Sequence, residues 1–311
     1  MELFSAPFLA LVGCWALNAV WPLVSQSGLR TYPPLVFTEA AFVLGFLFLL
    51  PELIRRREWK TFLSPKAACH FLAIAIFYGT PCLLYIAALS YTTPSSAGVV
   101  AEIEVLYSMV LSAWLLRESI GWRQAAASAM VVLGTGLILA HDSGTSRWKG
   151  DMMIAASAWM YQVSHILVKR LPAEVSPTAI TGGRLFYQSA VFVIPVCGWA
   201  LLRPTHAAWA WSWPGIGCAF VEGAGVIGVA GVFWYAAIRK IDLAKCTAFI
   251  LSYPALTMLL SWLLGREAIS AAQISGLAVT LAGAAWLSWL MIPTGAPSRL
   301  ELSADAARMT P

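Results

Sequence analysis

Two stretches of the chain decide how it folds. Residues 85–124 read YIAALSYTTPSSAGVVAEIEVLYSMVLSAWLLRESIGWRQ, and residues 234–273 read WYAAIRKIDLAKCTAFILSYPALTMLLSWLLGREAISAAQ. They align without a gap when Tyr85 is placed over Trp234, and this register continues to a shared glycine beyond them. The identical pairs include Met109/Met258, Ser112/Ser261, Arg117/Arg266, Glu118/Glu267, Ile120/Ile269, Gln124/Gln273 and Gly134/Gly283. Charged and amide residues that match in register between apolar segments indicate an internal repeat.

The repeat extends toward the N-terminus in a slightly different register. When Trp15 is placed over Trp159, further identical residues coincide. These pairs are Trp15/Trp159, Leu23/Leu167, Val24/Val168, Pro33/Pro177 and Pro51/Pro195. The two registers differ by about five residues, which the second copy holds after Pro195. The sequence therefore predicts that most of the chain is one unit present twice.

The composition places both copies in a membrane. Apolar residues make up 59% of the 311 residues and charged residues 11%, and the mean hydropathy is +0.74. Soluble domains carry about 25% charged residues. Apolar segments long enough to cross a bilayer as helices recur along the chain. The sequence predicts an all-α polytopic membrane protein whose ten transmembrane helices cover residues 6–26, 34–52, 68–90, 95–116, 121–140, 151–168, 178–201, 214–238, 243–264 and 271–292.

Five helices per copy is an odd number, so the second copy must enter the membrane with the opposite orientation. We expect a first repeat at residues 1–143, a second at 150–292 and a disordered cytoplasmic tail at 293–311. Inverted repeats are typical of secondary transporters, which bind substrate near the midplane between the two halves. Such a pair offers two related shapes, each open to one side, as alternating access requires.

Lysine and arginine residues predict the orientation. If the N-terminus is cytoplasmic, the cytoplasmic loops and tail hold 14 of these residues and the outer loops hold 5. The positive-inside rule then places both termini in the cytoplasm and the protein in the inner (cytoplasmic) membrane. The six cysteines form no CxxC motif or Cys/His cluster, so we expect no disulfide framework, no metal and no cofactor. No basic patch interleaved with aromatic residues indicates nucleic-acid binding.

The fourth segment, which contains VVAEIEVLYS, carries two glutamates. A carboxylate inside a span is costly and marks a substrate pathway or a proton relay by default. Glu102 and Glu104 lie on different helix faces, and Glu104 aligns with Tyr253. Ser108 aligns with Thr257 one turn later, so a polar stripe runs along one face of each helix. The two stripes are predicted to line the substrate route, with Tyr253, Ser108 and Thr257 as substrate-binding residues. Glu104 is predicted to bind a cationic group or a proton; its alternative role is a protonated hydrogen-bonding partner. Glu102 is equally a binding residue or a buried partner, and both are candidates for proton coupling.

Further polar residues are predicted to join the substrate site. Asn18 and Gln162 align, each three residues after a tryptophan, and Tyr161 is next to Gln162. His165 is one turn after Tyr161, although a membrane histidine is more often a helix-contact residue. Trp15 is a packing residue or stacks on substrate.

Two charged residues in the second copy complete the candidates. Glu222 lies in the small-residue run VEGAGVIGVAG and is a candidate cavity residue. Arg184 either binds a substrate carboxylate or extends to the cytoplasmic interface.

The paired segments LLRESI and LLGREAI, each after a span and before a glutamine, resemble the two EamA-type repeats of the drug/metabolite transporter superfamily. The resemblance covers about residues 5–292, and the family's fourth-span proline is matched by Pro254 but replaced by Val105 in the first copy. It implies ten spans, a central cavity and export or exchange of a small metabolite.

The expected function is a secondary transporter for an amino acid or related amphipathic compound, with the lipid bilayer and a small-molecule substrate as partners. The sequence does not decide whether transport is coupled to protons or whether the protein forms a homodimer. The alternatives are an uncoupled facilitator or a channel. A membrane-embedded enzyme is disfavoured, because the aspartates that flank the spans lie outside them and no phosphate-binding GxxxxGK[ST] loop is present.

Overall fold

The computed structural model describes residues 6–92, 97, 100–101, 103–117, 120–140, 148–202, 212–264 and 271–290. Every element within these ranges is a helix. The first repeat contains α1 (Ala6–Gly28), α2 (Pro34–Arg55), α3 (Trp59–Leu63), α4 (Pro65–Ala88), α6 (Ile103–Leu111), the π-helix η1 (Ser112–Leu116) and α7 (Trp122–Ala140). The second contains α8 (Trp148–Lys169), α9 (Pro177–Leu202), α10 (Trp213–Phe220), the π-helix η2 (Val221–Val229), α11 (Ala230–Ile238), α12 (Leu243–Ile250), α13 (Tyr253–Leu263) and α14 (Ala271–Leu290).

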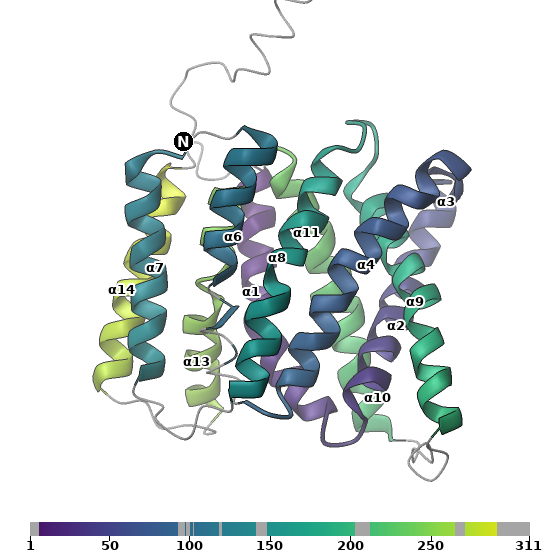
Figure 1. Ribbon diagram of the computed structural model, residues 1–311, viewed down its shortest axis with the longest axis horizontal. Coiled ribbons are helices and arrows are strands. Elements are labelled where there is room, and N and C mark those ends of the chain that lie inside the picture. Colours follow the sequence, from purple (N-terminus) through teal and green to yellow (C-terminus); the bar gives the residue numbers. More distant parts are fainter. Residues whose placement is uncertain are drawn as a thin grey trace, which may run out of the picture.

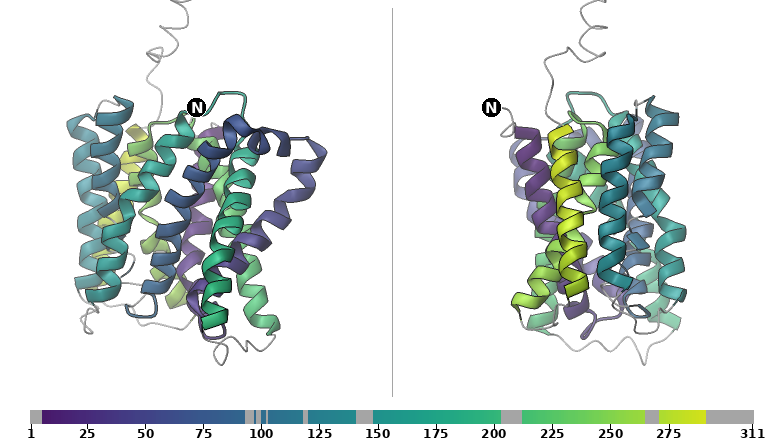
Figure 2. Two further views of the ribbon diagram at one scale, coloured as in Figure 1. Left: turned by 45° about the vertical axis from the view of Figure 1, so that its right-hand side comes forward. Right: turned by 90° about the vertical axis from the view of Figure 1, so that its left-hand side faces the viewer.

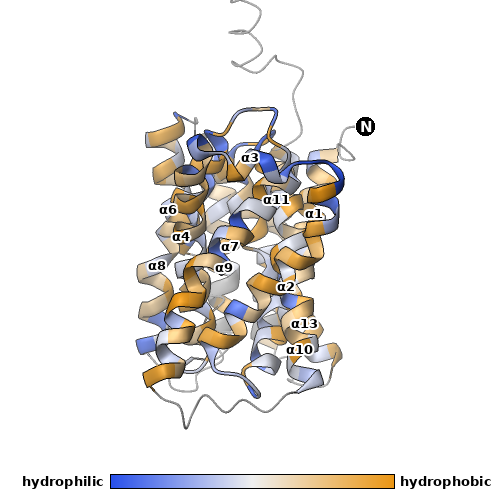
Figure 3. Ribbon diagram, turned by 90° about the vertical axis from the view of Figure 1, so that its right-hand side faces the viewer, coloured by the Kyte–Doolittle hydropathy of each residue, from blue (hydrophilic) through white to orange (hydrophobic). Residues whose placement is uncertain are grey.

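The helices lie side by side as a bundle, with their ends at two opposite faces (Figures 1 and 2). Within the described ranges, six helices are long and apolar enough to cross a membrane, and shorter apolar helices occupy 103–116 and 274–287. Large apolar side chains such as Leu106, Val110 and Trp114 are exposed on the sides of the bundle. Hydrophilic residues concentrate around α3, at one face (Figure 3). The chain is thus a multi-pass membrane protein, and the full count of ten spans stays a prediction.

Proline explains where several helices begin and where one breaks. Helices α2, α4 and α9 each begin with proline, whose missing N–H is not needed at that position. The predicted span at 243–264 is interrupted by a turn at residues 251–252, between α12 and α13. Pro254 follows directly and cannot donate the hydrogen bond that would continue α12. The predicted span is therefore present as the candidate span Leu243–Leu260, but it contains a turn at its centre.

Two further elements differ from the sequence prediction. Helix α3, at residues 59–63, lies in what was predicted as a loop. The predicted span at 214–238 is helical throughout, but its centre is the nine-residue π-helix η2. Long π-helices are rare, and short ones are frequent at functional sites.

Close glycine contacts hold neighbouring helices together. An added Cβ at Gly134 of α7 would lie 2.5 Å from the backbone nitrogen of Thr280 in α14. An added Cβ at Gly283 of α14 would lie 3.0 Å from the carbonyl oxygen of Ala127 in α7. These two glycines are equivalent in the sequence repeat and lie on one helix–helix contact. The contact is therefore of the reciprocal kind that a two-fold relation between the repeats produces.

Candidate functional site

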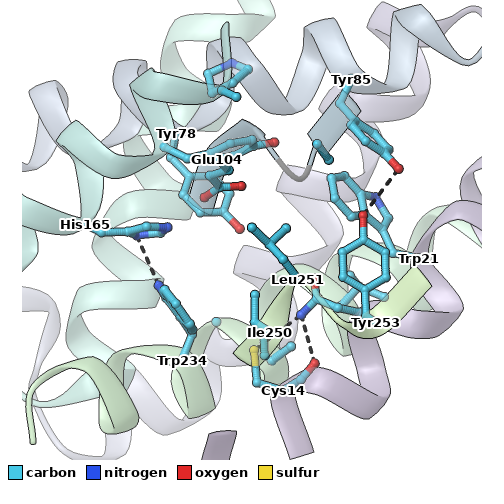
Figure 4. Close-up of a pocket in the computed structure, with 18 of the residues that line it drawn as sticks. Cys14, Trp21, Tyr78, Tyr85, Glu104, His165, Trp234, Ile250, Leu251 and Tyr253 are labelled. Carbon is cyan, nitrogen blue, oxygen red and sulfur yellow. Dashed lines mark hydrogen bonds between the residues drawn. The ribbon is translucent and has the colours of Figure 1, made fainter. Parts of the chain in front are cut away.

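A pocket lies at the centre of the bundle, between elements of both repeats (Figure 4). About 790 Å³ of space inside it is free of protein atoms, part of it open to the surroundings. The walls come from α1, α4, α6, α8, η2, α11 and the α12–α13 junction. Its lining residues are Cys14, Asn18, Trp21, Tyr78, Pro81, Tyr85, Ala101, Glu104, Ile154, Ser157, Ala158, Tyr161, His165, Val226, Ala230, Gly231, Trp234, Ile250, Leu251 and Tyr253.

Glu104 supplies the carboxylate in this lining. It lies on α6 of the first repeat, and its Oε1 accepts a hydrogen bond of 2.6 Å from Nε2 of Gln162 on α8 of the second repeat. Gln162 is buried and is the one hydrogen-bonding partner of Glu104 among the described residues. The bond fixes the carboxylate at the boundary between the two repeats, where a substrate site is expected in this architecture.

One group of aromatic residues lines one side of the pocket. The rings of Trp21 on α1 and Tyr85 on α4 are stacked, with centroids 4.4 Å apart. The hydroxyl groups of Tyr85 and Tyr253 lie 3.4 Å apart, at the outer limit for a hydrogen bond. The second contact joins the first repeat to the second.

A second aromatic pair lies on the other side of the pocket (Figure 4). Nε1 of Trp234 on α11 donates a hydrogen bond of 3.1 Å to Nδ1 of His165 on α8. The two ring centroids are 5.0 Å apart, in an edge-to-face arrangement. Aromatic pairs with this geometry attract each other beyond the area that they bury.

The two pairs are equivalent in the repeat. The register that aligns Trp15 with Trp159 also aligns Trp21 with His165, and the other register aligns Tyr85 with Trp234. The stacked pair Trp21–Tyr85 of the first repeat thus corresponds to the hydrogen-bonded pair His165–Trp234 of the second.

Contacts at the helix ends show that the pairs lie toward opposite faces of the bundle. Thr92, after α4, bonds Asp151 at the start of α8 at 2.8 Å, so α4 and α8 are antiparallel. The hydroxyl of Tyr32, after α1, donates to the carbonyl oxygen of Ser212, just before α10, at 3.4 Å. Trp21 and Tyr85 are near the C-terminal ends of α1 and α4, whereas His165 and Trp234 are near those of α8 and α11. The two pairs therefore lie toward opposite faces of the bundle, and all four side chains line the pocket.

Arg184 does not line the pocket, although it lies next to its wall. Its side chain is fully buried, and its guanidinium carbon is 3.7 Å from the ring centroid of Tyr78, which does line the pocket. Nη1 donates to the hydroxyl of Tyr235 at 3.1 Å, and Nη2 to the carbonyl oxygen of Ile227 at 2.9 Å. Complete burial contradicts the alternative that Arg184 extends to the cytoplasmic interface. The guanidinium instead fastens α9 to η2 and α11.

Glu222 lies behind another part of the wall. It is fully buried on η2 and accepts hydrogen bonds from Nε1 of Trp21 at 3.1 Å and Oγ of Ser25 at 2.7 Å. Both donors belong to α1. Glu222 therefore connects the π-helix of the second repeat to the first helix of the first repeat, and it holds the indole that stacks on Tyr85.

The other predicted residues divide between the pocket and its surroundings. Asn18 and Tyr161 line the pocket, and Nδ2 of Asn18 donates to the carbonyl oxygen of Cys14 at 2.8 Å. Ser108 is buried, and its hydroxyl has no hydrogen-bonding partner among the described residues.

Thr257 and Trp15 bind other helices instead of lining the pocket. Thr257 donates to the carbonyl oxygen of Ala19 at 2.8 Å, and Trp15 donates to Oγ of Ser252 at 2.9 Å. Glu102 lies outside the described residues.

The sequence analysis did not single out Trp21, Tyr78, Tyr85 and Trp234 as site residues. For three of them a signal was present. Trp21 and Tyr85 occupy positions equivalent to His165 and Trp234, so the registers that paired Asn18 with Gln162 could have identified both aromatic pairs. Tyr78 has no comparable signal, because only the folded chain places its ring against Arg184 in the wall of the pocket.

Known proteins share this sequence pattern and this fold. The EamA-like transporter family model matches residues 5–140 and 148–289, one match for each repeat. The chain is 23% identical over 310 residues to "Uncharacterized transporter sll1164" of Synechocystis sp. (strain ATCC 27184 / PCC 6803 / Kazusa), covering 89% of this chain and 84% of that protein.

A solved structure titled "Crystal structure of protein" superimposes with a TM-score of 0.75 at 22% identity, covering 92% of this chain and 98% of that one. That likeness shows a shared fold. The family match, which extends over both repeats and most of the chain, shows more: the chain is a membrane transporter and belongs to the EamA-like transporter family.

Proposed function

We propose that the protein is a secondary transporter that moves a small organic metabolite across the cytoplasmic membrane by alternating access. The observation that carries the proposal is the pair of repeat-equivalent aromatic contacts around one central pocket. Trp21–Tyr85 lies toward one face and His165–Trp234 toward the other, and all four side chains line the pocket. In this proposal each pair is the closure on its own side. If one pair opens while the other stays closed, the pocket faces the two sides in turn, and the symmetry of the repeats makes the two open states structurally alike.

The substrate in this proposal is an amino acid or a related amphipathic compound, and Glu104 binds its amino group. Glu104 is the carboxylate in the described lining and is held by Gln162. Asn18, Tyr161 and Tyr253 provide further polar contacts, and the aromatic rings provide the apolar wall. Export is the proposed direction, with both termini in the cytoplasm as the lysine and arginine distribution predicts.

Glu104 is also the position at which we propose that a proton binds when the substrate is absent. A carboxylate that binds either a proton or a cationic substrate would couple the two movements in opposite directions. The geometry supports this role because the carboxylate lines the pocket and joins the two repeats through Gln162.

Counterflow in proteoliposomes tests the proposal. Vesicles with wild-type protein are preloaded separately with unlabelled amino acids, amines, sugars or nucleosides, and uptake of the labelled compound is measured. We expect trans-stimulated uptake for one class and its loss in Glu104→Gln. Ser108→Ala is the matched control, because Ser108 lies on the same face of α6, one turn further, and does not line the pocket.

Two outcomes would contradict parts of the proposal. Uptake without trans-stimulation would indicate a channel or an uncoupled pore. Full counterflow in Glu104→Gln would remove Glu104 from the substrate site.

A further inference from the structure

We infer that the pocket selects organic monocations, that is, amines with an aromatic or apolar body and no carboxylate. This inference rests on the proposed function. It narrows the proposed substrates from amino acids and related amphipathic compounds to amines that carry no carboxylate. It depends on the charges that line the pocket, on the partners that already occupy the nearby cation, and on the density of aromatic rings.

The described lining contains an acidic side chain, Glu104, but no lysine or arginine. An amino-acid zwitterion would satisfy its ammonium group at Glu104 but would bring its own carboxylate into the pocket. A buried carboxylate without a cationic partner or several hydrogen-bond donors is strongly disfavoured.

His165 does not supply the missing positive charge. Its Nδ1 accepts the hydrogen bond from Nε1 of Trp234, and a ring nitrogen that accepts a hydrogen bond carries no proton. The imidazole is therefore neutral in this arrangement, with its proton on Nε2. It can donate one hydrogen bond to a ligand, but it cannot form an ion pair with a carboxylate.

Arg184 is the nearest cation, and it is already engaged. Two of its nitrogens donate to the hydroxyl of Tyr235 and the carbonyl oxygen of Ile227. The ring of Tyr78, which lines the pocket, lies 3.7 Å from the guanidinium carbon, and Nε is buried without a hydrogen-bonding partner among the described residues. Arg184 itself does not line the pocket, so a substrate carboxylate could reach the guanidinium only if the wall around it moved.

The rest of the lining suits a cation with an apolar body. Around the space next to Glu104, aromatic rings come from Trp21, Tyr85, Trp234 and Tyr253 (Figure 4), and Tyr161 also lines the pocket. Aromatic faces attract ammonium groups within about 6 Å, most strongly where water is excluded. The same rings cover an apolar body through dispersion and loss of water. An amine is thus bound by the ion pair with Glu104, by the attraction of the rings for its ammonium group and by burial of its apolar body. An amino acid gains the same three effects but loses affinity because its carboxylate is buried without a partner.

A matched ligand series tests this inference. 2-Phenylethylamine, L-phenylalanine and 3-phenylpropionate have the same ring and differ in charge: cation, zwitterion and anion. Binding is measured on purified full-length protein through protection of Cys14, whose thiol lines the pocket, against a small thiol reagent. For this measurement the other five cysteines are replaced by alanine. The shift of Tm on adding each ligand to the wild-type protein gives a second measure of binding. We expect the amine to bind at least about tenfold more tightly than phenylalanine, and phenylpropionate not to protect.

Two variants make the test specific for Glu104. Glu104→Gln should reduce protection by the amine at least about tenfold and leave the affinity for phenylalanine much less changed. Tyr187→Phe is the control, because Tyr187 donates to the carbonyl oxygen of Phe62 away from the pocket. It should bind the amine as the wild type does.

The outcomes separate this inference from the proposed function. Phenylalanine binding as tightly as the amine, or more tightly, would overturn the inference and leave a carrier. Counterflow of sugars or nucleosides without protection by the amine would also overturn the inference and leave the carrier. Protection by the amine, without counterflow of any amine, would support the monocation site and contradict the carrier mechanism.

Discussion

Nε1 of Trp234 donates a hydrogen bond of 3.1 Å to Nδ1 of His165, and this pair occupies the position in the second repeat that the Trp21–Tyr85 stack occupies in the first. The two contacts differ in chemistry, and all four side chains line the pocket. Two copies of one sequence unit therefore place different contacts at equivalent positions of the wall, one a ring stack and the other a directed hydrogen bond. If the pairs open in turn, as we propose, each opening breaks a different interaction.

Removing either pair should expose the pocket to a different side of the membrane. The background for this test is a variant that retains Cys14 and no other cysteine, labelled with a charged thiol reagent that does not cross the membrane. Tyr85→Ala should speed labelling of Cys14 from the outer side. Trp234→Ala should speed labelling from the cytoplasmic side. An aromatic pair contributes about 0.5–1.5 kcal/mol, so a roughly 2- to 10-fold change in labelling rate is expected. The measurement uses right-side-out and inside-out vesicles. Equal acceleration from both sides in either variant would show that the pairs do not act as separate closures.

The contact between α2 and the π-helix η2 should not tolerate a methyl group. An added Cβ at Gly223 would lie 2.1 Å from the carbonyl oxygen of Ala41, so Gly223→Ala must separate the two helices. Overpacking of this kind costs about 1–3 kcal/mol or more. Gly225→Ala, in the same π-helix, is the matched control because nothing lies within 4 Å of its added Cβ. Thermal unfolding in detergent should show a lower Tm for Gly223→Ala and little change for Gly225→Ala; equal Tm values would refute the close contact.

The hydrogen bonds of Glu222 should stabilise the fold through both acceptor oxygens. Glu222→Leu leaves Nε1 of Trp21 without its buried partner, a loss of roughly 1–3 kcal/mol, whereas Oγ of Ser25 can still donate to the carbonyl oxygen of Trp21 at 3.0 Å. Glu222→Gln retains one acceptor oxygen and should be destabilised less. Ser25→Ala removes one donor and should lie between the wild type and Glu222→Leu. The order of Tm values tests this, and a Glu222→Leu variant as stable as the wild type would contradict it.

Lysine should not replace Arg184. The planar guanidinium donates to Tyr235 and Ile227 and stacks on Tyr78, whereas one ammonium group cannot maintain all three contacts. Arg184→Lys should therefore lower the stability by about 1–3 kcal/mol for each buried hydrogen bond that it loses, and reduce the folded yield. Tyr235→Phe removes one hydrogen-bond acceptor and should cost about 1–3 kcal/mol. Fluorescence-detected size exclusion measures both, and a fully folded Arg184→Lys protein would show that the stacking contact is dispensable.

Much of the architecture follows from patterns that the sequence displays directly. Apolar length and spacing locate the helices, and matched charged or amide residues reveal the repeat. Asn18, Glu104, Tyr161, His165 and Tyr253 were proposed as site residues, and all of them line the pocket. They were found because a polar side chain within an apolar helix needs a partner or a cavity.

Other features depend on which helices become neighbours, and this cannot be deduced from helix periodicity. Arg184 is enclosed by groups from α4, η2 and α11, three separate parts of the chain. Trp15 and Thr257 have the residue types of a substrate site but bond Ser252 and Ala19 on other helices. The break between α12 and α13 was missed because the apolar run continues through it, although Pro254 was a local signal.

The alignment of Glu104 with Tyr253 has one more consequence. The two aromatic pairs occupy equivalent positions in the two repeats. The carboxylate does not, because the position equivalent to Glu104 in the second repeat is Tyr253. In the proposed mechanism a ligand with a charged end would meet two similar walls and one anchor, so its charged end would stay at Glu104 in both conformations. Such a ligand would cross the membrane without reversing its orientation.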